Sequence, residues 1–254
     1  MSAATATPRV IYQHPRLLAE RSTHYCPGCG HGVIHRLLAE VLDELGVGPR
    51  TIAVAPVGCA VFIYDYLLVD FVEAPHGRAP AVATGIKRVR PDAFVLTYQG
   101  DGDLAAIGTA EIVHAAARGE LITALFVNNG IYGMTGGQMA PTTLLGQHTS
   151  SSPTGRDARL HGYPVPMTEM LAIVPGVAYA ARGSVADPAA IGRTKSYIKR
   201  ACQVQLEGTG FGIVEILSNC PVGWGMTPQE SMAWLATKVS ETYPPGVLVD
   251  RSRS

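Results

Sequence analysis

One stretch of this sequence, residues 93–127, limits the possible fold more than any other. Residues 93–98 form an apolar run typical of a buried strand, an alanine-rich helical segment follows over 104–118, and residues 121–127 form a second apolar run. A strand, a helix and a strand in this order predict a right-handed βαβ unit in a parallel sheet. The sequence therefore predicts an open α/β fold with a mostly parallel sheet flanked by helices.

The rest of the chain extends this pattern, and we expect residues 1–254 to form a single domain. Further strands are predicted at 51–55, 69–73 and 212–217, and further helices at 31–45, 80–90, 167–173, 187–206 and 228–238. Gly46 is placed to end the helix over 31–45. Residues 1–24 are expected to form an irregular arm, and residues 134–165 a long loop of the kind that is functional or mobile.

The composition argues against several classes of function. Lys plus Arg equals Asp plus Glu at 20 each, which gives no sign of a nucleic-acid-binding protein. No apolar run approaches the roughly 20 residues that cross a bilayer, and residues 1–7 lack the apolar core of a secretory signal. We therefore expect a cytoplasmic protein, in which cysteines are free thiols, catalytic groups or metal ligands.

Two polar motifs follow the two strands of the βαβ unit. GDGD occupies residues 100–103 and NNGIYGMTGGQ residues 128–138, so both are expected at the carboxyl edge of the sheet, where open α/β folds bind ligands. Glycines and a helix N-terminus suit a diphosphate there. Such a diphosphate needs Mg²⁺, which takes about six oxygen ligands. Asp101, Asn129 and the carbonyl of Ile131 are the candidate ligands, and ordinary β-turns are the alternative.

The cysteines form a second pattern. Cys26 and Cys29 stand in a CxxC turn before a helix, while Cys59 and Cys220 each follow a strand. Four sulfurs fit either a structural zinc or a [4Fe–4S] cluster, and spacing alone does not choose. A zinc ribbon would normally have a second close pair, which this chain lacks. Cys202 lies in the helix over 187–206 and is predicted to be a small buried hydrophobe.

Together, YCPGCGHG, VGCA, GDGD, NNGIYGMTGGQ and SNCP resemble the β subunits of 2-oxoacid:ferredoxin oxidoreductases, in the same order and over nearly the whole chain. The resemblance implies a thiamine-diphosphate-binding fold with Mg²⁺ and a [4Fe–4S] cluster. It implies that the cluster is held by Cys26, Cys29, Cys59 and Cys220. Contacts with the cofactor are expected from Gly58, Cys59, Ala60, His76, Gly77, Gly102, Asp103 and Thr135.

Some of these residues have simpler alternative roles. His76 is the candidate catalytic residue, because it is expected beside the thiamine, where it would contact the cofactor or the substrate carboxylate. The alternative is a surface turn that caps a helix. Asp103 and Thr135 are expected to contact the diphosphate or metal-bound water, and their alternatives are a helix N-cap and a loop hydroxyl.

The resemblance also implies an activity and partners. The family oxidises a 2-oxo acid with coenzyme A to acyl-CoA and CO2 and passes electrons to ferredoxin, and the overall similarity favours 2-oxoglutarate or branched-chain substrates. The family takes the carboxylate that activates thiamine from an α subunit, and Glu111 is expected to face away from the cofactor. We therefore expect an α partner, a γ partner and a ferredoxin-like δ subunit, and no activity from this chain alone.

Two other functions remain open. A subunit of a non-oxidative thiamine-diphosphate decarboxylase or synthase would share GDG and NN but would not explain the cysteines. A structural metal module with four cysteine ligands or an electron-transfer module would explain the cysteines but not Asp101 and Asn129. The iron, sulfide and thiamine-diphosphate contents of the chain separate these possibilities.

Overall fold

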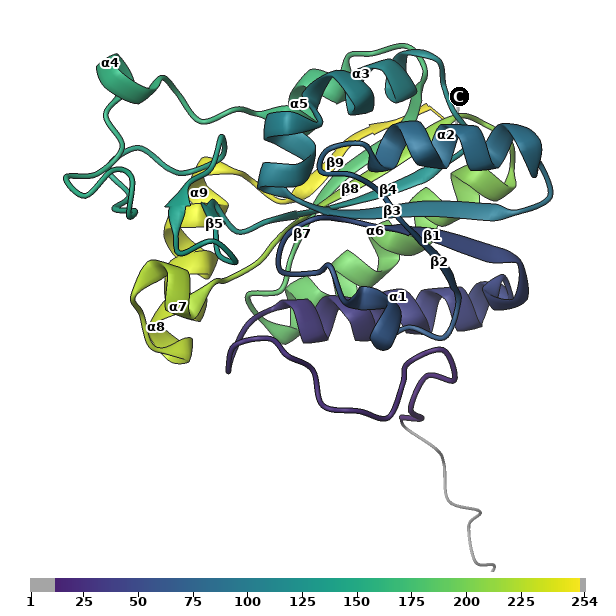
Figure 1. Ribbon diagram of the computed structural model, residues 1–254, viewed down its shortest axis with the longest axis horizontal. Coiled ribbons are helices and arrows are strands. Elements are labelled where there is room, and N and C mark those ends of the chain that lie inside the picture. Colours follow the sequence, from purple (N-terminus) through teal and green to yellow (C-terminus); the bar gives the residue numbers. More distant parts are fainter. Residues whose placement is uncertain (1–11, 252–254) are drawn as a thin grey trace, which may run out of the picture.

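A seven-stranded sheet forms the centre of the computed structural model, which describes residues 12–251 (Figure 1). The strands lie in the order β2-β1-β3-β4-β8-β7-β9. Their bounds are β1 Thr51–Ala55, β2 Asp70–Glu73, β3 Phe94–Gly100, β4 Thr123–Asn128, β7 Val177–Ser184, β8 Phe211–Leu217 and β9 Gly246–Asp250. Every neighbouring pair is parallel except β7 and β9, which are antiparallel. The predicted open, mostly parallel α/β sheet is confirmed.

Helices cover both faces of this sheet (Figure 1). α1 (His31–Leu45) and α6 (Pro188–Leu206) lie on one face, and α2 (Ala79–Val89), α3 (Thr109–Ala117) and α5 (Met167–Ala172) lie on the other. The short elements are η1 Gly48–Arg50, η2 Ile63–Asp65, β5 Ile131–Tyr132, β6 Gln138–Met139, α4 Ala158–His161, α7 Pro221–Trp224, α8 Pro228–Trp234, η4 Leu235–Val239 and α9 Ser240–Thr242. No helix among the described residues is long and apolar enough to cross a membrane.

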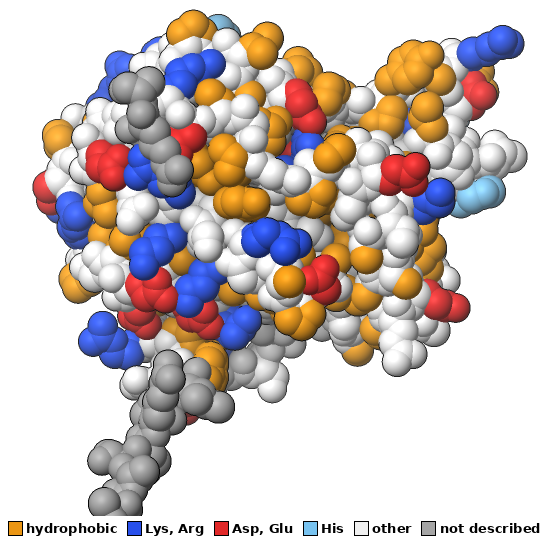
Figure 2. All heavy atoms as spheres, turned by 180° about the vertical axis from the view of Figure 1, so that it is seen from behind, with side chains coloured by type: hydrophobic (Ala, Val, Ile, Leu, Met, Phe, Trp, Pro, Cys, Tyr) orange, Lys and Arg blue, Asp and Glu red, His pale blue; other side chains and the backbone are white. Residues whose placement is uncertain are grey.

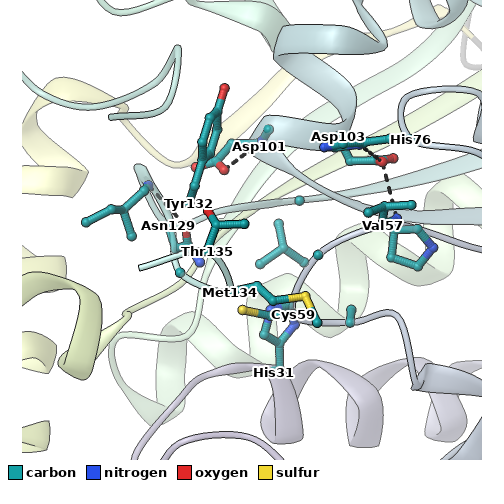
Figure 3. A pocket seen from close by; sticks show the side chains of 18 residues that line it. His31, Val57, Cys59, His76, Asp101, Asp103, Asn129, Tyr132, Met134 and Thr135 are labelled. Atoms are coloured by element: carbon teal, nitrogen blue, oxygen red, sulfur yellow. Dashed lines mark hydrogen bonds and ion pairs between the residues drawn. The ribbon is translucent and has the colours of Figure 1, made fainter. Parts of the chain in front are cut away.

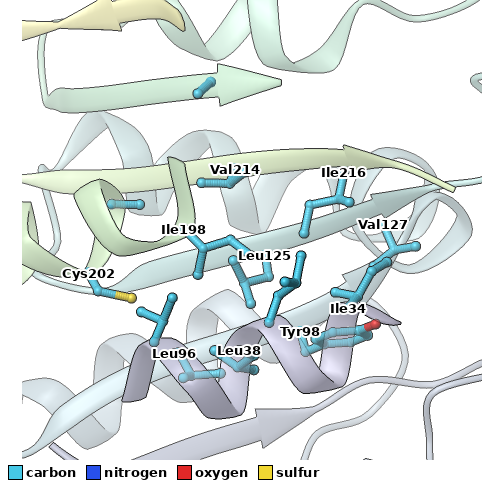
Figure 4. Packing of buried hydrophobic residues seen from close by; sticks show 14 of the residues in the cluster. Ile34, Leu38, Leu96, Tyr98, Leu125, Val127, Ile198, Cys202, Val214 and Ile216 are labelled. Carbon is cyan, nitrogen blue, oxygen red and sulfur yellow. The ribbon is translucent and has the colours of Figure 1, made fainter. Parts of the chain in front are cut away.

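A hydrophobic core fills the space between the sheet and each helical layer. On the α1 and α6 side, Ile34 and Leu38 of α1 pack with Ile198 of α6 against Leu96 and Leu125 of the sheet (Figure 4). Side chains of this kind each contribute about 1.5–3 kcal/mol when they are fully buried. The central strands are buried along both faces, which explains why they appear in the sequence as continuous apolar runs. Cys202 is fully buried in this core, as predicted.

The helix predicted over 104–118 is present but interrupted. It begins as a π-helical turn, η3 (Gly102–Ile107), and continues after Gly108 as α3. The loop that contains Gly77 crosses this break so closely that a Cβ on Gly108 would lie 2.7 Å from the carbonyl oxygen of Gly77. Single π-helical turns are frequent at functional sites, and this one begins at Gly102, within the GDGD motif.

Other differences from the prediction lie in the second half of the chain. β7 and β9 are strands that the sequence pattern did not indicate, and the helix predicted over 228–238 is divided into α8, η4 and α9. The long loop predicted over 134–165 is mostly irregular, with β6 and α4 inside it. Residues 12–24 are irregular apart from one bridge between Leu18 and Leu67. The first part of the predicted arm, residues 1–11, lies outside the described residues.

Candidate functional site

A pocket opens at the carboxyl ends of β1, β3 and β4 (Figure 3). Most of the residues predicted to bind the cofactor or its metal line it, namely Gly58, Cys59, Ala60, His76, Asp101, Gly102, Asp103, Asn129, Ile131 and Thr135. Gly77, Cys26, Cys29 and Cys220 are not part of the lining. The structure also places His31, Val57, Tyr132, Gly133 and Met134 in the wall, which sequence reasoning did not predict.

Asp101 is a buried carboxylate in the pocket wall. Its side chain accepts hydrogen bonds from the backbone N–H of Gly102 at 2.8 Å and from the hydroxyl of Thr142 at 3.0 Å. Among residues 12–251, no Lys, Arg or His side chain forms an ion pair with it, and burial raises the pKa of Asp101 to about 6. A buried carboxylate without a counter-charge is costly, so this position suits a bound cation.

The NN motif forms a tight turn beside Asp101. The carbonyl oxygen of the Asn128 side chain accepts from Gly130 N at 3.1 Å, and that of Asn129 accepts from Ile131 N at 3.2 Å. Gly130 has a φ of 66°, which favours glycine. The candidate ligands of Asp101, Asn129 and Ile131 are all oxygen atoms, which is the donor set that Mg²⁺ prefers. The residues present therefore fit a magnesium ion.

Asp103 connects three segments of the pocket. One carboxylate oxygen lies 2.5 Å from His76 Nδ1 and accepts from the backbone N–H groups of Gly77 at 2.9 Å and Val57 at 3.3 Å. The other accepts from Gln99 Nε2 at 2.6 Å. Asp103 thus ties the loops after β1 and β2 to the GDGD turn. Its predicted contact with the diphosphate or metal-bound water stays a prediction.

The helix-cap alternative for Asp103 is wrong. The residue that caps the N-terminus of η3 is Asp101, whose side chain accepts a hydrogen bond from the backbone N–H of Gly102. Asp103 lies inside η3. His76 does not cap α2 with its side chain either, since the residue before that helix is Arg78. Thr135 donates to Gln138 Oε1 at 2.5 Å in the exposed part of the pocket rim. Its predicted contact with the diphosphate or metal-bound water stays a prediction as well.

The cysteines converge beside this pocket. A Cβ on Gly133, which is part of the pocket wall, would lie 3.3 Å from the sulfur of Cys59 and 3.3 Å from the sulfur of Cys220. Burial, together with a smaller contribution from negative charge on Cys29 and Cys26, raises the pKa of Cys59 to about 11 and that of Cys220 to about 12. Several thiolates in one buried region need a cationic centre between them, so the cysteine set fits a metal centre.

The CxxC turn is held against the Cys220 segment. Asn219 donates from Nδ2 to the carbonyl oxygen of Gly28 at 2.9 Å and to Ser231 Oγ at 2.9 Å. This places Cys26 and Cys29 beside the end of β8. Within residues 12–251, no three His, Cys, Asp or Glu side chains close around a single metal ion. The choice between a zinc ion and a cluster therefore stays a prediction.

His31 lies at the base of the pocket, next to Cys59 in Figure 3. Its Nδ1 is 2.7 Å from the hydroxyl of Tyr98, and burial lowers the pKa of His31 to about 4, so the ring is neutral. The Tyr98 hydroxyl is buried and has no other partner among the described residues. It is therefore the donor to Nδ1, which leaves the proton of His31 on Nε2. Only the tertiary structure brings this histidine to the cofactor pocket.

Comparison with known proteins decides the family. Residues 57–216 match the family model described as thiamine pyrophosphate enzyme, C-terminal TPP binding domain. The ketoisovalerate oxidoreductase subunit VorA of Methanothermobacter thermautotrophicus is 49% identical over 92% of this chain and 49% of that protein. The 2-oxoglutarate synthase subunit KorB of Methanocaldococcus jannaschii is 38% identical over 84% of this chain and 76% of that protein. The chain belongs to the thiamine-diphosphate-binding subunits of the 2-oxoacid:ferredoxin oxidoreductases.

A solved structure from the same family supports the assignment. The 2-oxoglutarate:ferredoxin oxidoreductase from Magnetococcus marinus, with 2-oxoglutarate, coenzyme A and succinyl-CoA bound, aligns with a TM-score of 0.77 and 25% identity. The alignment covers 95% of this chain and 86% of that chain. The predicted thiamine-diphosphate-binding fold is thereby confirmed. The chain spans about half the length of the VorA proteins that it matches, at 49%.

Proposed function

We propose that this chain is the β subunit of a coenzyme A-dependent 2-oxoacid:ferredoxin oxidoreductase. In this proposal it binds thiamine diphosphate and Mg²⁺ in the pocket and passes electrons to a [4Fe–4S] cluster. The cluster is held by Cys26, Cys29, Cys59 and Cys220. The product is an acyl-CoA, and the electrons leave through ferredoxin. We also propose a cytoplasmic location, where cysteine ligands stay reduced.

One observation carries the proposal. Cys59 lines the same pocket as Asp101 and Asn129, and Gly133 in that pocket lies between Cys59 and Cys220. A redox centre on these sulfurs would therefore border the cofactor directly. A non-oxidative thiamine enzyme has no use for this arrangement, and an electron-transfer module has no use for the buried, uncompensated carboxylate of Asp101.

The side chains of the pocket have different roles in this proposal. When bound, thiamine diphosphate supplies a carbon nucleophile and an electron sink. Asp101, Asn129 and Ile131 would hold the Mg²⁺ that neutralises its diphosphate. His76 is held through Nδ1 by Asp103 and has no partner at Nε2 among residues 12–251. That nitrogen is available to the cofactor or to the substrate carboxylate.

A partner subunit must complete the site. Activation of thiamine needs a carboxylate near its aminopyrimidine ring. The carboxylates in the described lining are Asp101, the candidate metal ligand, and Asp103, which is held by His76 and Gln99, and no glutamate occurs there. Glu111 forms an ion pair with Arg78 at 2.7 Å and is not part of the lining, as the sequence predicted. We propose that an α subunit supplies the missing acid, and that γ and ferredoxin-like δ subunits complete the enzyme.

The surface supports such partners. The segment that carries α4 reaches away from the sheet (Figure 1), and in Figure 2 some hydrophobic side chains lie on it beside charged and polar ones. There Leu160 is 81% exposed and Tyr163 74% exposed. Ile173, after α5, is 80% exposed. Large apolar side chains that are exposed in this way suit contacts with another protein.

The substrate is a 2-oxo acid of the branched-chain or 2-oxoglutarate type, as the names of VorA and KorB suggest. No Lys or Arg occurs in the described lining of the pocket, so a second substrate carboxylate would find its partner on another subunit. The test is anaerobic assay of the copurified complex with 3-methyl-2-oxobutanoate, 2-oxoglutarate or pyruvate and a viologen dye. We expect coenzyme A-dependent dye reduction. Release of CO2 without dye reduction would instead identify a non-oxidative decarboxylase.

A further inference from the structure

A buried ion pair joins β7 and β8 near the candidate metal site. Arg182 of β7 and Glu215 of β8 are each 1% exposed and occupy paired positions on neighbouring strands. Arg182 Nε donates to Glu215 Oε2 at 2.8 Å, and the guanidinium also binds both oxygens of Glu169 at 2.6 and 2.8 Å. A buried pair of this kind is often no more stabilising than a well-packed apolar pair. Its contacts therefore point to a role other than stability.

Glu215 of this ion pair is hydrogen-bonded to the NN turn. Glu215 Oε1 accepts from Nδ2 of Asn128 at 2.7 Å, and Oδ1 of the same Asn128 accepts from Gly130 N. The carboxylate thereby fixes which way the Asn128 amide faces and so holds the backbone of the turn. The candidate ligands Asn129 and Ile131 stand on either side of Gly130 in that turn.

Arg182 of the ion pair is connected to Asp101 through Tyr243 and Thr142. The guanidinium of Arg182 lies 5.2 Å from the centre of the Tyr243 ring, and the Tyr243 hydroxyl donates to the carbonyl oxygen of Thr142 at 2.9 Å. The hydroxyl of Thr142 in turn donates to Asp101 Oδ2. Asp101 and Asn129 of the candidate metal site, which lie close together in Figure 3, are thus both connected to the same ion pair.

We propose that Glu215 and Arg182 are positioning residues for the Mg²⁺–thiamine diphosphate site. They are not among the candidate ligands, but they hold Asn128 and Tyr243 so that the oxygen ligands of Asp101 and of the NN turn face one ion. The inference rests on the proposed function, because it requires a metal at Asp101 and Asn129. Mutation of a residue that hydrogen-bonds to the ligands of a metal site typically changes the affinity for the metal 10–100-fold.

The test compares Glu215→Gln with Glu120→Gln in the anaerobically copurified complex. Glu120 is a matched control, because it is 7% exposed and pairs with Arg88 and Arg118 just before β4, at the opposite edge of the sheet. Mn²⁺ binding in the presence of thiamine diphosphate is measured from the EPR signal of free Mn²⁺. We expect roughly tenfold or greater loss of affinity for Glu215→Gln and wild-type affinity for Glu120→Gln.

A milder variant keeps the inference testable if Glu215→Gln does not fold. Tyr243→Phe retains the ring against Arg182 and removes one hydrogen bond, so we expect Mn²⁺ affinity to fall roughly fivefold. Wild-type affinity in Tyr243→Phe, or equal losses in Glu215→Gln and Glu120→Gln, would overturn the positioning role. If the wild-type complex binds neither Mn²⁺ nor thiamine diphosphate, the proposed function fails, and the inference fails with it.

Discussion

Replacing Asp101 by Asn should stabilise the metal-free chain while it removes the affinity for metal. Asp101 is 3% exposed, and burial raises its pKa from 3.8 to about 6, although the hydroxyl of Thr142 opposes the shift. One pKa unit corresponds to 1.36 kcal/mol. Ionisation of this carboxyl therefore costs the folded chain about 3 kcal/mol at a pH well above 6.

The sign of the pH dependence follows from the direction of the shift. Because the pKa in the folded chain is higher than in the unfolded chain, the group favours folding by binding a proton. That contribution is fully present below about pH 3.8 and is lost as the pH rises through about 6. Asn cannot ionise, so the advantage of Asp101→Asn should be about 1.5 kcal/mol at pH 5 and about 3 kcal/mol at pH 7.5.

The assay is anaerobic guanidinium unfolding of the chain after treatment with EDTA. The change in the stability difference between pH 5 and pH 7.5 is the decisive quantity, because any pH-independent effect of the new amide cancels. We expect this change to be about 1.5 kcal/mol in favour of Asp101→Asn. Added Mg²⁺ and thiamine diphosphate should then stabilise the wild type and leave the variant unaffected. A stability difference that stays constant or shrinks with rising pH would refute the reasoning.

Three further predictions test other parts of the site. Cys59→Ser should lower the iron content of the anaerobically purified chain, whereas Cys202→Ser in the core of α6 should leave it unchanged. Gly133→Ala places a methyl group between the sulfurs of Cys59 and Cys220 and should also lower the iron content. Gly32→Ala, which has open space around it in α1, should instead stabilise the chain by up to about 1 kcal/mol with normal iron. Asp103→Asn should weaken thiamine diphosphate binding roughly tenfold in calorimetric titration, because the loops that contain Val57 and His76 lose a charged acceptor.

The local motifs explain why much of the site could be predicted from sequence. When GDG or NN directly follows a buried strand, the position of the motif can be predicted. Parallel strands end at the same edge of the sheet, so the motif lies at that edge. The same holds for the CxxC turn before α1, whose helix begins at His31 and is capped by Gly46 as expected. Residues of GDGD and of the NN motif therefore line one pocket in the structure, whereas Cys26 and Cys29 of the CxxC turn are not part of its lining.

The remaining parts depend on contacts between distant segments. β7 was missed because Arg182 interrupts its apolar pattern, and the partner that makes this charge acceptable, Glu215, stands 33 positions later. Thr142 lies in the loop predicted over 134–165 and nevertheless is buried against Asp101. His31 reaches the pocket only because α1 packs beneath β3 and Tyr98. Periodicity and spacing contain no information about such partners.

The most direct test of the account is the composition of the chain itself. Anaerobic purification followed by iron, sulfide and thiamine-diphosphate analysis of the same sample should give about four iron and four sulfide with about one thiamine diphosphate per chain. Thiamine diphosphate together with zinc, or with no metal on the cysteines, would contradict electron transfer to a cluster beside the cofactor.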